Sequence, residues 1–294
     1  MKAPAFDYVR PGSVAEAVGL LARHGDAAKL IAGGQSLVPA LNLRLLAPEI
    51  LIDLGGLADL SGIAVEDGVL RLGAMTRHSE VERSTEIARH APLLRQAIGH
   101  VAHPAIRNRG TLGGNVANAD PASELPACLV ALAATVVAEG PGGRRRIPAE
   151  EFVTGVYETA LAPDEVLVAV EVPLARDDER FSFAELSRRS GDYALVGLAA
   201  RARIVDGRIA AARPVFFAVG GGPVLARGAA AALEGRVPDE AVVEAAVAAL
   251  ADDLAPEADL QVTAATRLHL ARVLLRRAVA ELAGRGAGHH AEAA

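Results

Sequence analysis

Two stretches decide the fold of this chain, Ala32-Gly33-Gly34-Gln35-Ser36 and Thr111-Leu112-Gly113-Gly114-Asn115. Each carries a pair of glycines followed by a polar side chain. Glycine adopts positive φ without strain and has no Cβ, so the backbone N–H groups of such a loop can approach an anion closely. Neither a P-loop nor a strand-linked GxGxxG pattern occurs in the chain. The two stretches therefore predict a pyrophosphate site unlike those of ATPases and ordinary Rossmann folds.

Composition narrows the classes of partner. The chain has 294 residues and 51% hydrophobic content, enough for one large or two to three small domains with a packed core. Its net charge of -6 and isoelectric point near 5.8 argue against nucleic acid or an anionic membrane as the main partner. The N-terminus lacks a secretory signal pattern and no apolar run nears the length of a membrane span. We expect a cytoplasmic protein with no membrane span.

The cysteine content and the residues near the glycine stretches argue against metal sites and catalytic groups on this chain. The single cysteine, Cys128, lies in an apolar run and is typical of a small buried hydrophobe rather than a reactive thiol. One cysteine cannot hold an iron–sulfur cluster or a usual structural zinc, so no metal site is predicted on this chain. Near the glycine stretches there is no nucleophile with a neighbouring base and no acid–base pair. No catalytic residue is therefore assigned, and the chain alone is not expected to oxidise an organic substrate.

Local patterns predict the order of elements. Ser13 and Glu16 are spaced as a capping box and Gly25 as a helix end, which predicts a helix over 14–24. Asp67-Gly68 between alternating apolar residues predicts a hairpin. We further expect strands at 29–32, 50–54, 63–66, 69–72, 166–172 and 215–219, a strand pair around Asp206-Gly207, a solvated hairpin turn within 139–146, and helices within 79–100, after 124, and near 239–252 and 264–283.

The same patterns predict domain limits. A proline and charge-rich stretch at 173–180 is typical of a linker and predicts a boundary near residue 176. The N-terminal domain, 1–176, divides into subdomains of about 1–56 and 57–176, and an independent α+β domain follows over 177–285. The short polar tail, 286–294, is expected to be disordered.

The glycine stretches with their flanks resemble the FAD-binding medium subunit of the molybdenum hydroxylases, the group of xanthine dehydrogenase and aerobic carbon monoxide dehydrogenase. The resemblance runs in order over residues 3–283. The matching segments are Phe6-Asp7-Tyr8, 32–39, Ile52-Asp53-Leu54, 106–115, Ala119-Asp120-Pro121, Thr154-Gly155, 161–165 and 188–194. It implies an α+β protein: a two-subdomain FAD-binding fold of the PCMH, vanillyl-alcohol oxidase-like type, followed by a C-terminal domain like that of the carbon monoxide dehydrogenase flavoprotein.

The resemblance also implies a ligand set. Residues 32–36 and 111–115 would wrap the FAD pyrophosphate, with side-chain bonds from Ser36, Thr111 and Asn115. Glu124 and Asn118 match positions near the adenosine end of FAD, and Tyr193 would stack on the flavin ring. Arg107 and Arg109 flank the second stretch; from the residues alone they compensate the phosphates or are solvated or paired with Asp120. Relatives often carry a lysine where this chain has Ala184-Glu185, which puts any flavin-tuning cation there in doubt.

The implied function is electron transfer in a complex. A large molybdopterin subunit and a small subunit with two [2Fe-2S] clusters would accompany the chain, as a heterotrimer that forms dimers. Electrons would reach FAD from those clusters and leave to an external acceptor such as a quinone. Two alternatives stay open at this point: a self-sufficient flavin oxidase of the same broad fold, and a scaffold that has lost FAD. The sequence identifies neither the substrate oxidised at molybdenum, nor the acceptor, nor the flavin potential.

Overall fold

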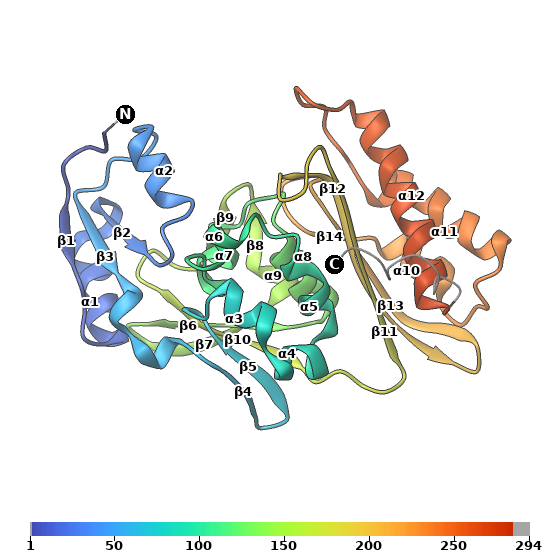
Figure 1. The fold of residues 1–294 in the computed structure, drawn as a ribbon, viewed down its shortest axis with the longest axis horizontal. Helices are drawn as coiled ribbons and strands as arrows, with labels where there is room; N and C mark the ends of the chain where they lie inside the picture. The colour runs from blue at the N-terminus through green and yellow to red at the C-terminus, as the bar shows by residue number, and fades with distance from the viewer. Residues whose placement is uncertain (1, 285–294) are drawn as a thin grey trace.

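The computed structural model describes residues 2–284, and the predicted disordered tail at 286–294 lies outside them. Three units follow one another along the longest axis of the molecule (Figure 1). A small parallel sheet lies at the N-terminal end, a five-stranded antiparallel sheet with helices lies in the centre, and a four-stranded antiparallel sheet backed by helices lies at the C-terminal end. This is the α+β organisation expected from the sequence.

The N-terminal unit positions the first glycine stretch. Its sheet has the order β1-β3-β2, with both pairings parallel. The stretch 32–36 connects β2 to the short helix α2, so a strand that is only partly buried ends directly at the loop. The elements are β1 (Asp7–Val9), α1 (Val14–His24), β2 (Ala28–Ile31), α2 (Leu37–Asn42) and β3 (Ile50–Asp53), with 3-10 turns at Gly25–Ala27, Leu54–Gly56 and Ala58–Leu60.

Helix α1 forms where the capping pattern predicts it. The Ser13 hydroxyl accepts a hydrogen bond from the Glu16 N–H at 3.1 Å, and the Glu16 carboxylate accepts one from the Gly12 N–H at 2.7 Å. Gly25 ends the helix with φ of 52°, and its N–H bonds the Leu21 carbonyl. In a capping box the Glu16 carboxylate would accept from the Ser13 N–H; here it accepts from the N–H one residue earlier, that of Gly12.

The central unit holds the second glycine stretch. Its sheet has the order β4-β5-β10-β6-β7, and Asp67-Gly68 turns the β4–β5 hairpin as predicted. The strands are β4 (Ile63–Glu66), β5 (Val69–Gly73), β6 (Thr135–Gly140), β7 (Gly143–Pro148), β8 (Val153–Gly155), β9 (Glu158–Thr159) and β10 (Val166–Pro173). The helices are α3 (His78–Arg83), α4 (Thr85–His90), α5 (Pro92–Ile98), α6 (Pro104–Arg107), α7 (Leu112–Asn118), α8 (Glu124–Ala131) and α9 (Ala149–Phe152).

Two features of this unit differ from the sequence expectation. The predicted helical stretch at 79–100 is divided into α3, α4 and α5, because Ser84 caps α4 through the Ile87 N–H and Pro92, which lacks an N–H, begins α5. The second glycine stretch is the first turn of α7 rather than a free loop, because the Thr111 side chain caps that helix. The turn within 139–146 is the β6–β7 hairpin, as expected.

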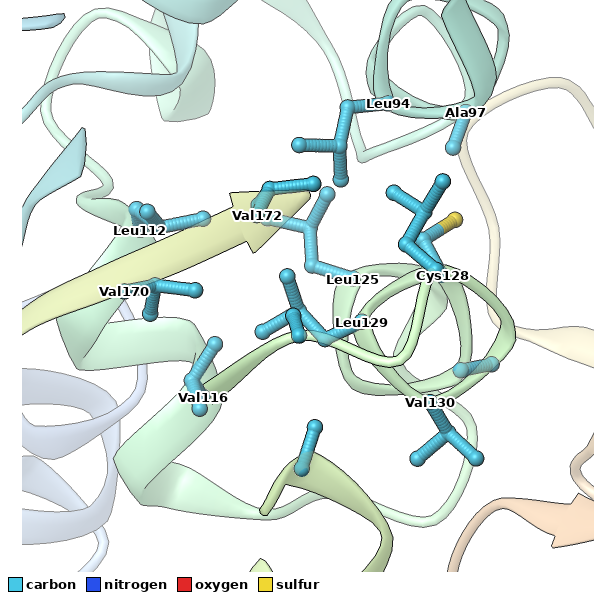
Figure 2. Close-up of a cluster of buried hydrophobic side chains, with 14 of the residues drawn as sticks. Leu94, Ala97, Leu112, Val116, Leu125, Cys128, Leu129, Val130, Val170 and Val172 are labelled. Atoms are coloured by element: carbon cyan, nitrogen blue, oxygen red, sulfur yellow. The ribbon is translucent and has the colours of Figure 1, made fainter. Parts of the chain in front are cut away.

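A bulge in strand β10 changes the face of the central sheet on which its alternate side chains lie. The β10–β6 register shifts between Leu167 and Ala169. Before the shift, Val166 and Val168 pack against the N-terminal unit; after it, Val170 and Val172 pack against the helices. Figure 2 shows Val170 and Val172 beside Leu112, Val116 and the α8 side chains Leu125 and Leu129. The helices that begin at the candidate site residues are thereby anchored on the sheet.

The C-terminal unit closes the opposite side of α8. Its strands are β11 (Glu179–Ser187), β12 (Ala194–Val205), β13 (Arg208–Phe217) and β14 (Val224–Leu225), and its helices are α10 (Arg227–Leu233), α11 (Glu240–Asp253) and α12 (Ala264–Leu282). One face of the sheet packs on α10–α12, while Ala199, Val215 and Phe217 join the central core. The strand predicted at 215–219 is the end of β13, since Pro214 stays within the strand and its carbonyl accepts the Ala226 N–H.

Candidate functional site

The first glycine stretch presents open backbone donors. Within the described residues, the N–H groups of Gly33, Gly34, Gln35 and Ser36 make no hydrogen bond to a protein acceptor. Gly34 has φ of 72°, a conformation that favours glycine, and Gln35 folds back to donate its side-chain amide to the Gly33 carbonyl at 3.0 Å. Ser36 is exposed and its side chain does not cap α2. These consecutive donors are free to bind an anion.

In the second stretch the backbone donors are already used. The Leu112 N–H bonds the Thr76 carbonyl at 2.9 Å and the Gly113 N–H bonds the Ala74 carbonyl at 2.8 Å. The Gly114 N–H bonds the Thr111 hydroxyl at 3.1 Å. The Asn115 N–H bonds the Thr111 carbonyl at 3.0 Å. These bonds hold the start of α7 against the strand-end segment 74–76, so this stretch offers a ligand its side chains and the helix end rather than free loop amides.

The glycines bring the two stretches together across 80 sequence positions. A Cβ on Gly33 would overlap the Arg109 carbonyl oxygen and lie 2.9 Å from the Gly110 Cα. A Cβ on Gly114 would lie 2.7 Å from the Thr111 hydroxyl and 3.4 Å from the Ala32 Cβ. Gly113 is different, because its missing Cβ makes room for Ala74 at 2.5 Å. Backbone packing is therefore one reason for these glycines, in addition to the ligand clearance inferred from the sequence.

Two arginine side chains hold the segment that precedes the second stretch. Arg107 is buried and donates to the Glu82 carboxylate, with N–O distances of 3.1 Å, and to the Ala102 carbonyl at 2.9 Å. It therefore has a structural partner, and that partner is Glu82 rather than the Asp120 considered from the sequence. Arg77 donates to the Arg109 carbonyl, which faces Gly33. The region ahead of Thr111 is held by these arginines.

His78 is buried directly beside the second stretch. It is 3% exposed, and within the described residues neither ring nitrogen has a hydrogen-bond partner. A Cβ on Gly110 would lie 2.9 Å from its Nδ1. Burial lowers the pKa of His78 to about 4, with Arg107 and Arg77 lowering it further. The ring is therefore neutral at physiological pH and packs against Gly110.

Acidic and phenolic groups gather after helix α7. The Asn115 side-chain oxygen accepts the Ser123 hydroxyl at 2.7 Å, which ties α7 to the start of α8. Asp120 accepts the Tyr157 hydroxyl at 3.1 Å. Burial, followed by Asp120 and Glu124, raises the pKa of Tyr193. Tyr193 thus lies near these acids, although its chain position is far from theirs, and it is 67% exposed.

Glu124 has the electrostatic signature of a site residue. Burial raises its pKa to about 7, with the neighbouring carboxylates of Glu185 and Asp120 raising it and His100 lowering it. The structure therefore places Glu124 near Tyr193. It packs stretch 32–36 against stretch 111–115. The Ser123–Asn115 hydrogen bond joins these two groups, because Ser123 directly precedes Glu124. Asn118 is half-buried at the end of α7, and Ala119 follows it in the left-handed conformation.

Sequence reasoning missed several members of this region. Tyr157, His78 and His100 carry no motif of their own, and their proximity depends on long-range folding. One compositional signal was available for Tyr157, because the chain has only three tyrosines. Asp120 was considered from the sequence only as a partner of Arg107 and Arg109, whereas the structure pairs it with the Tyr157 hydroxyl.

The residues present fit a dinucleotide with a pyrophosphate. Four consecutive open N–H groups and a glycine at positive φ, with the polar side chains of Thr111 and Asn115 packed close by, can hold two phosphate charges without lysine. Residues 4–175 match the family described as the FAD binding domain in molybdopterin dehydrogenase. Residues 181–282 match the carbon monoxide dehydrogenase flavoprotein C-terminal domain. The chain belongs to the FAD-binding subunits of the molybdenum hydroxylases.

Individual relatives agree with this family. The chain is 39% identical to the 6-hydroxypseudooxynicotine dehydrogenase complex subunit alpha of Paenarthrobacter nicotinovorans, over 77% of this chain and 76% of that protein. It is 36% identical to the carbon monoxide dehydrogenase medium chain of Afipia carboxidovorans, over 93% and 95%. The structure superimposes on carbon monoxide dehydrogenase from Hydrogenophaga pseudoflava with a TM-score of 0.95 and 37% identity, over 97% of this chain and 99% of that one.

This FAD-binding subunit is therefore part of an oxidoreductase of the molybdenum hydroxylase family, and its relatives act in multi-subunit complexes. Quinoline 2-oxidoreductase from Pseudomonas putida 86 is also similar, with a TM-score of 0.92 and 39% identity over 97% of this chain and 100% of that one. Over residues 2–284, no helix is both long and apolar enough to cross a membrane.

Proposed function

We propose that this subunit binds one FAD noncovalently and passes electrons through it from a partner subunit to an external acceptor. The supporting observation is the run of open N–H donors at residues 33–36, which Gly33 packs against Arg109 and Gly110, directly ahead of α7. When bound, the flavin supplies the redox chemistry: it accepts electrons singly from iron–sulfur clusters and releases them to the acceptor. The chain's own residues bind the cofactor, orient it and set its electrostatic surroundings.

The binding roles divide by chemistry. The first stretch, Ala32 to Ser36, donates backbone N–H groups to the pyrophosphate, while the Ser36, Thr111 and Asn115 side chains add polar contacts. Leu112, Gly113 and Gly114 form the helix start that closes the other side. Asn118 and Glu124 contact the adenosine end, and Tyr193 covers one face of the flavin ring. The complete proposed set is Ala32, Gly33, Gly34, Gln35, Ser36, Thr111, Leu112, Gly113, Gly114, Asn115, Asn118, Glu124 and Tyr193.

The assembly and domain division are part of the same proposal. The partners are a large molybdopterin subunit and a small subunit with two [2Fe-2S] clusters, in a cytoplasmic dimer of heterotrimers. Domains are assigned to 1–176, with subdomains at about 1–56 and 57–176, and to 177–285. Co-expression with the subunits of its own complex should recover all three together. Turnover of an aldehyde, purine or aromatic substrate by the isolated chain at the rate of the complex would instead favour the self-sufficient oxidase.

Flavin content tests the site. Gly34→Val places a branched side chain at φ of 72° where the pyrophosphate is held, so the folded variant should lose FAD. Gly207→Val is the matched control, since Gly207 has the same φ of 72° but lies in the distant β12–β13 turn. The control should keep about one FAD per chain. Full flavin content in folded Gly34→Val would remove the first stretch from the site, and a folded parent without flavin would favour the scaffold alternative.

A further inference from the structure

Four large apolar side chains are exposed close together, beside the first glycine stretch. They are Val38, Leu43, Leu45 and Leu46, on helix α2 and the turn that follows it, and we call them the α2 patch. Leu45 is 74% exposed and Leu43 is 55% exposed. Single exposed apolar residues are ordinary on protein surfaces, whereas a group of neighbouring ones marks an interaction surface.

The backbone of this segment is well determined although its leucines face solvent. The N–H groups of Leu43 and Leu45 both bond carbonyls of α2, at 2.9 Å. Arg44, between them, has φ of 58°, a conformation that is unfavourable for a residue with a Cβ, and its Nε donates to the Lys2 carbonyl at 3.3 Å. The leucines are thus presented in fixed positions, so burying them on a partner costs little further ordering.

The charges around the patch have one sign. The chain carries a net charge of -6, yet no acidic residue occurs between Asp26 and Glu49. The charged residues in that interval are Lys29 and Arg44, and Lys2 adjoins Arg44 through its carbonyl. Within the described residues, the Arg44 guanidinium pairs with no carboxylate. An apolar centre with a cationic rim fits a partner surface that is apolar at its centre and acidic around it.

The patch is continuous with the proposed cofactor site. A Cβ on Gly34 would lie 3.2 Å from the Val38 Cγ2, so the patch begins directly beside the open donors at 33–36. Helix α2 follows that stretch without an intervening residue. A subunit that covers the α2 patch therefore also comes close to the bound cofactor.

We propose that the α2 patch is a surface on which the iron–sulfur subunit docks. This inference rests on the proposed function, because a subunit that passes electrons to the flavin must lie beside the cofactor, whereas the molybdopterin subunit need not. Thiolate ligands give iron–sulfur clusters a net negative charge, which is complementary to the cationic rim. A second copy of this chain fits less well, since a two-fold interface would bring the same cations together.

Co-expression of the tagged chain with the subunits of its own complex tests this surface. Leu45→Glu should reduce the iron–sulfur subunit recovered with the chain at least tenfold. Because Leu45 is exposed, the variant should keep its FAD and its stability in urea. Leu260→Glu is the matched control, since Leu260 is fully exposed on the loop between α11 and α12, at the opposite end of the molecule (Figure 1). Undiminished recovery of the iron–sulfur subunit with Leu45→Glu would overturn the proposal.

The other possible occupants give different results in the same variant. Loss of FAD from folded Leu45→Glu would place the patch within the cofactor site. Loss of the molybdopterin subunit alone would assign the patch to that partner, and altered self-association of the isolated chain would assign it to a second copy. Each of these results would overturn the docking of the iron–sulfur subunit. A parent chain that holds no FAD, or recovers no iron–sulfur subunit, would refute the proposed function and this inference with it.

The cationic rim has a separate test. Arg44→Gln removes one charge beside the patch, so reduction of the flavin by the reduced iron–sulfur subunit should slow several-fold at low salt and depend less steeply on ionic strength. The matched control is Arg277→Gln on the distant helix α12, which should leave both unchanged. The same rate and the same salt dependence in Arg44→Gln and the parent would contradict the charge match.

Discussion

At the scale of single residues, close packing explains why particular glycines are required. Gly113 is buried against Ala74, and a Cβ would lie 2.5 Å from the Ala74 Cβ and 2.8 Å from its carbonyl oxygen. Neither backbone can move easily, because the Gly113 N–H bonds that same carbonyl. Steric exclusion at Gly113 is therefore part of the fold, whereas Gly34 is required for its positive φ.

Gly113→Ala tests this packing. The added methyl group should destabilise the folded chain by about 1–3 kcal/mol, the usual cost of overpacking a core. Gly19→Ala is the control, because it lies within α1 with nothing inside 4 Å, and alanine there should stabilise by about 0.5–1 kcal/mol. Urea unfolding of both variants measures the two effects. Equal stability of Gly113→Ala and the parent would contradict the close contact with Ala74.

Glu124 predicts a pH dependence of stability. Its pKa is raised from 4.5 to about 7 in the folded chain, so between those values the folded state binds more protons than the unfolded state. Because buried His78, whose pKa is lowered to about 4, contributes the opposite slope below pH 6.5, it is the Glu124 contribution to stability, rather than the total, that should fall as pH rises through this window. The raised pKa of His100, caused first by its bond to Glu185, acts in the same direction. The difference in unfolding free energy between the parent and Glu124→Gln should therefore decrease as pH rises from 5 to 7.

Glu165 provides the control with the opposite sign. Its bond with Arg145 lowers its pKa, so its contribution is present above pH 4.5 and is lost as pH falls. Glu165→Gln should therefore leave the slope between pH 5 and 7 unchanged. A pH-independent difference between the parent and Glu124→Gln would contradict the raised pKa of Glu124.

Tyr193 makes a separate prediction. Its side chain is largely exposed beside Asp120 and Glu124. Aromatic stacking contributes about 0.5–1.5 kcal/mol beyond burial, which is too little to control FAD affinity. Tyr193→Ala should keep FAD bound, while flavin fluorescence and the rate of reaction with oxygen increase. Unchanged fluorescence and oxidation rates would assign this tyrosine no role at the flavin.

At the scale of elements, the short helix α6 and its Arg107 position the second stretch. Arg107 lies shortly before Gly110 and Thr111 in the chain. Its side chain joins Glu82 of α3 to the loop carbonyls of Val101 and Ala102. Arg107→Lys cannot reproduce this planar set of donors. We expect weaker FAD binding together with a loss of stability of about 1–3 kcal/mol. Arg144→Lys, on the exposed β6–β7 hairpin, should have little effect on either.

Elements with strong local signals were predictable. Ser13 and Gly25 mark both ends of α1, and Asp67-Gly68 marks the β4–β5 turn, because caps and tight turns are determined within a few residues. The divisions of 79–100 at Ser84 and Pro92 were not predicted, although both residues carry start signals. An apolar pattern continuing across them outweighed those signals. The bond partners of Leu112 and Gly113 lie in 74–76, and no local pattern indicates such pairing.

At the scale of the whole molecule, the candidate site lies between units rather than within one. The first stretch belongs to the N-terminal unit, the second to the central unit, and Tyr193 to the turn before β12 of the C-terminal unit (Figure 1). The motif residues could be listed from the sequence, but the His100–Glu185 pair depends on docking of the C-terminal sheet against α5. That docking is the physical reason why the His100–Glu185 pair was not predicted.

We infer that this chain receives electrons from its partners and does not oxidise substrate itself. The direct measurement is anaerobic flavin absorbance after addition of the substrate that the intact complex oxidises. We expect rapid bleaching in the assembled complex and none in the isolated FAD-loaded chain until the reduced iron–sulfur subunit is added. Bleaching of the isolated chain by substrate alone, or a flavin that stays oxidised while reduced clusters are present, would contradict it.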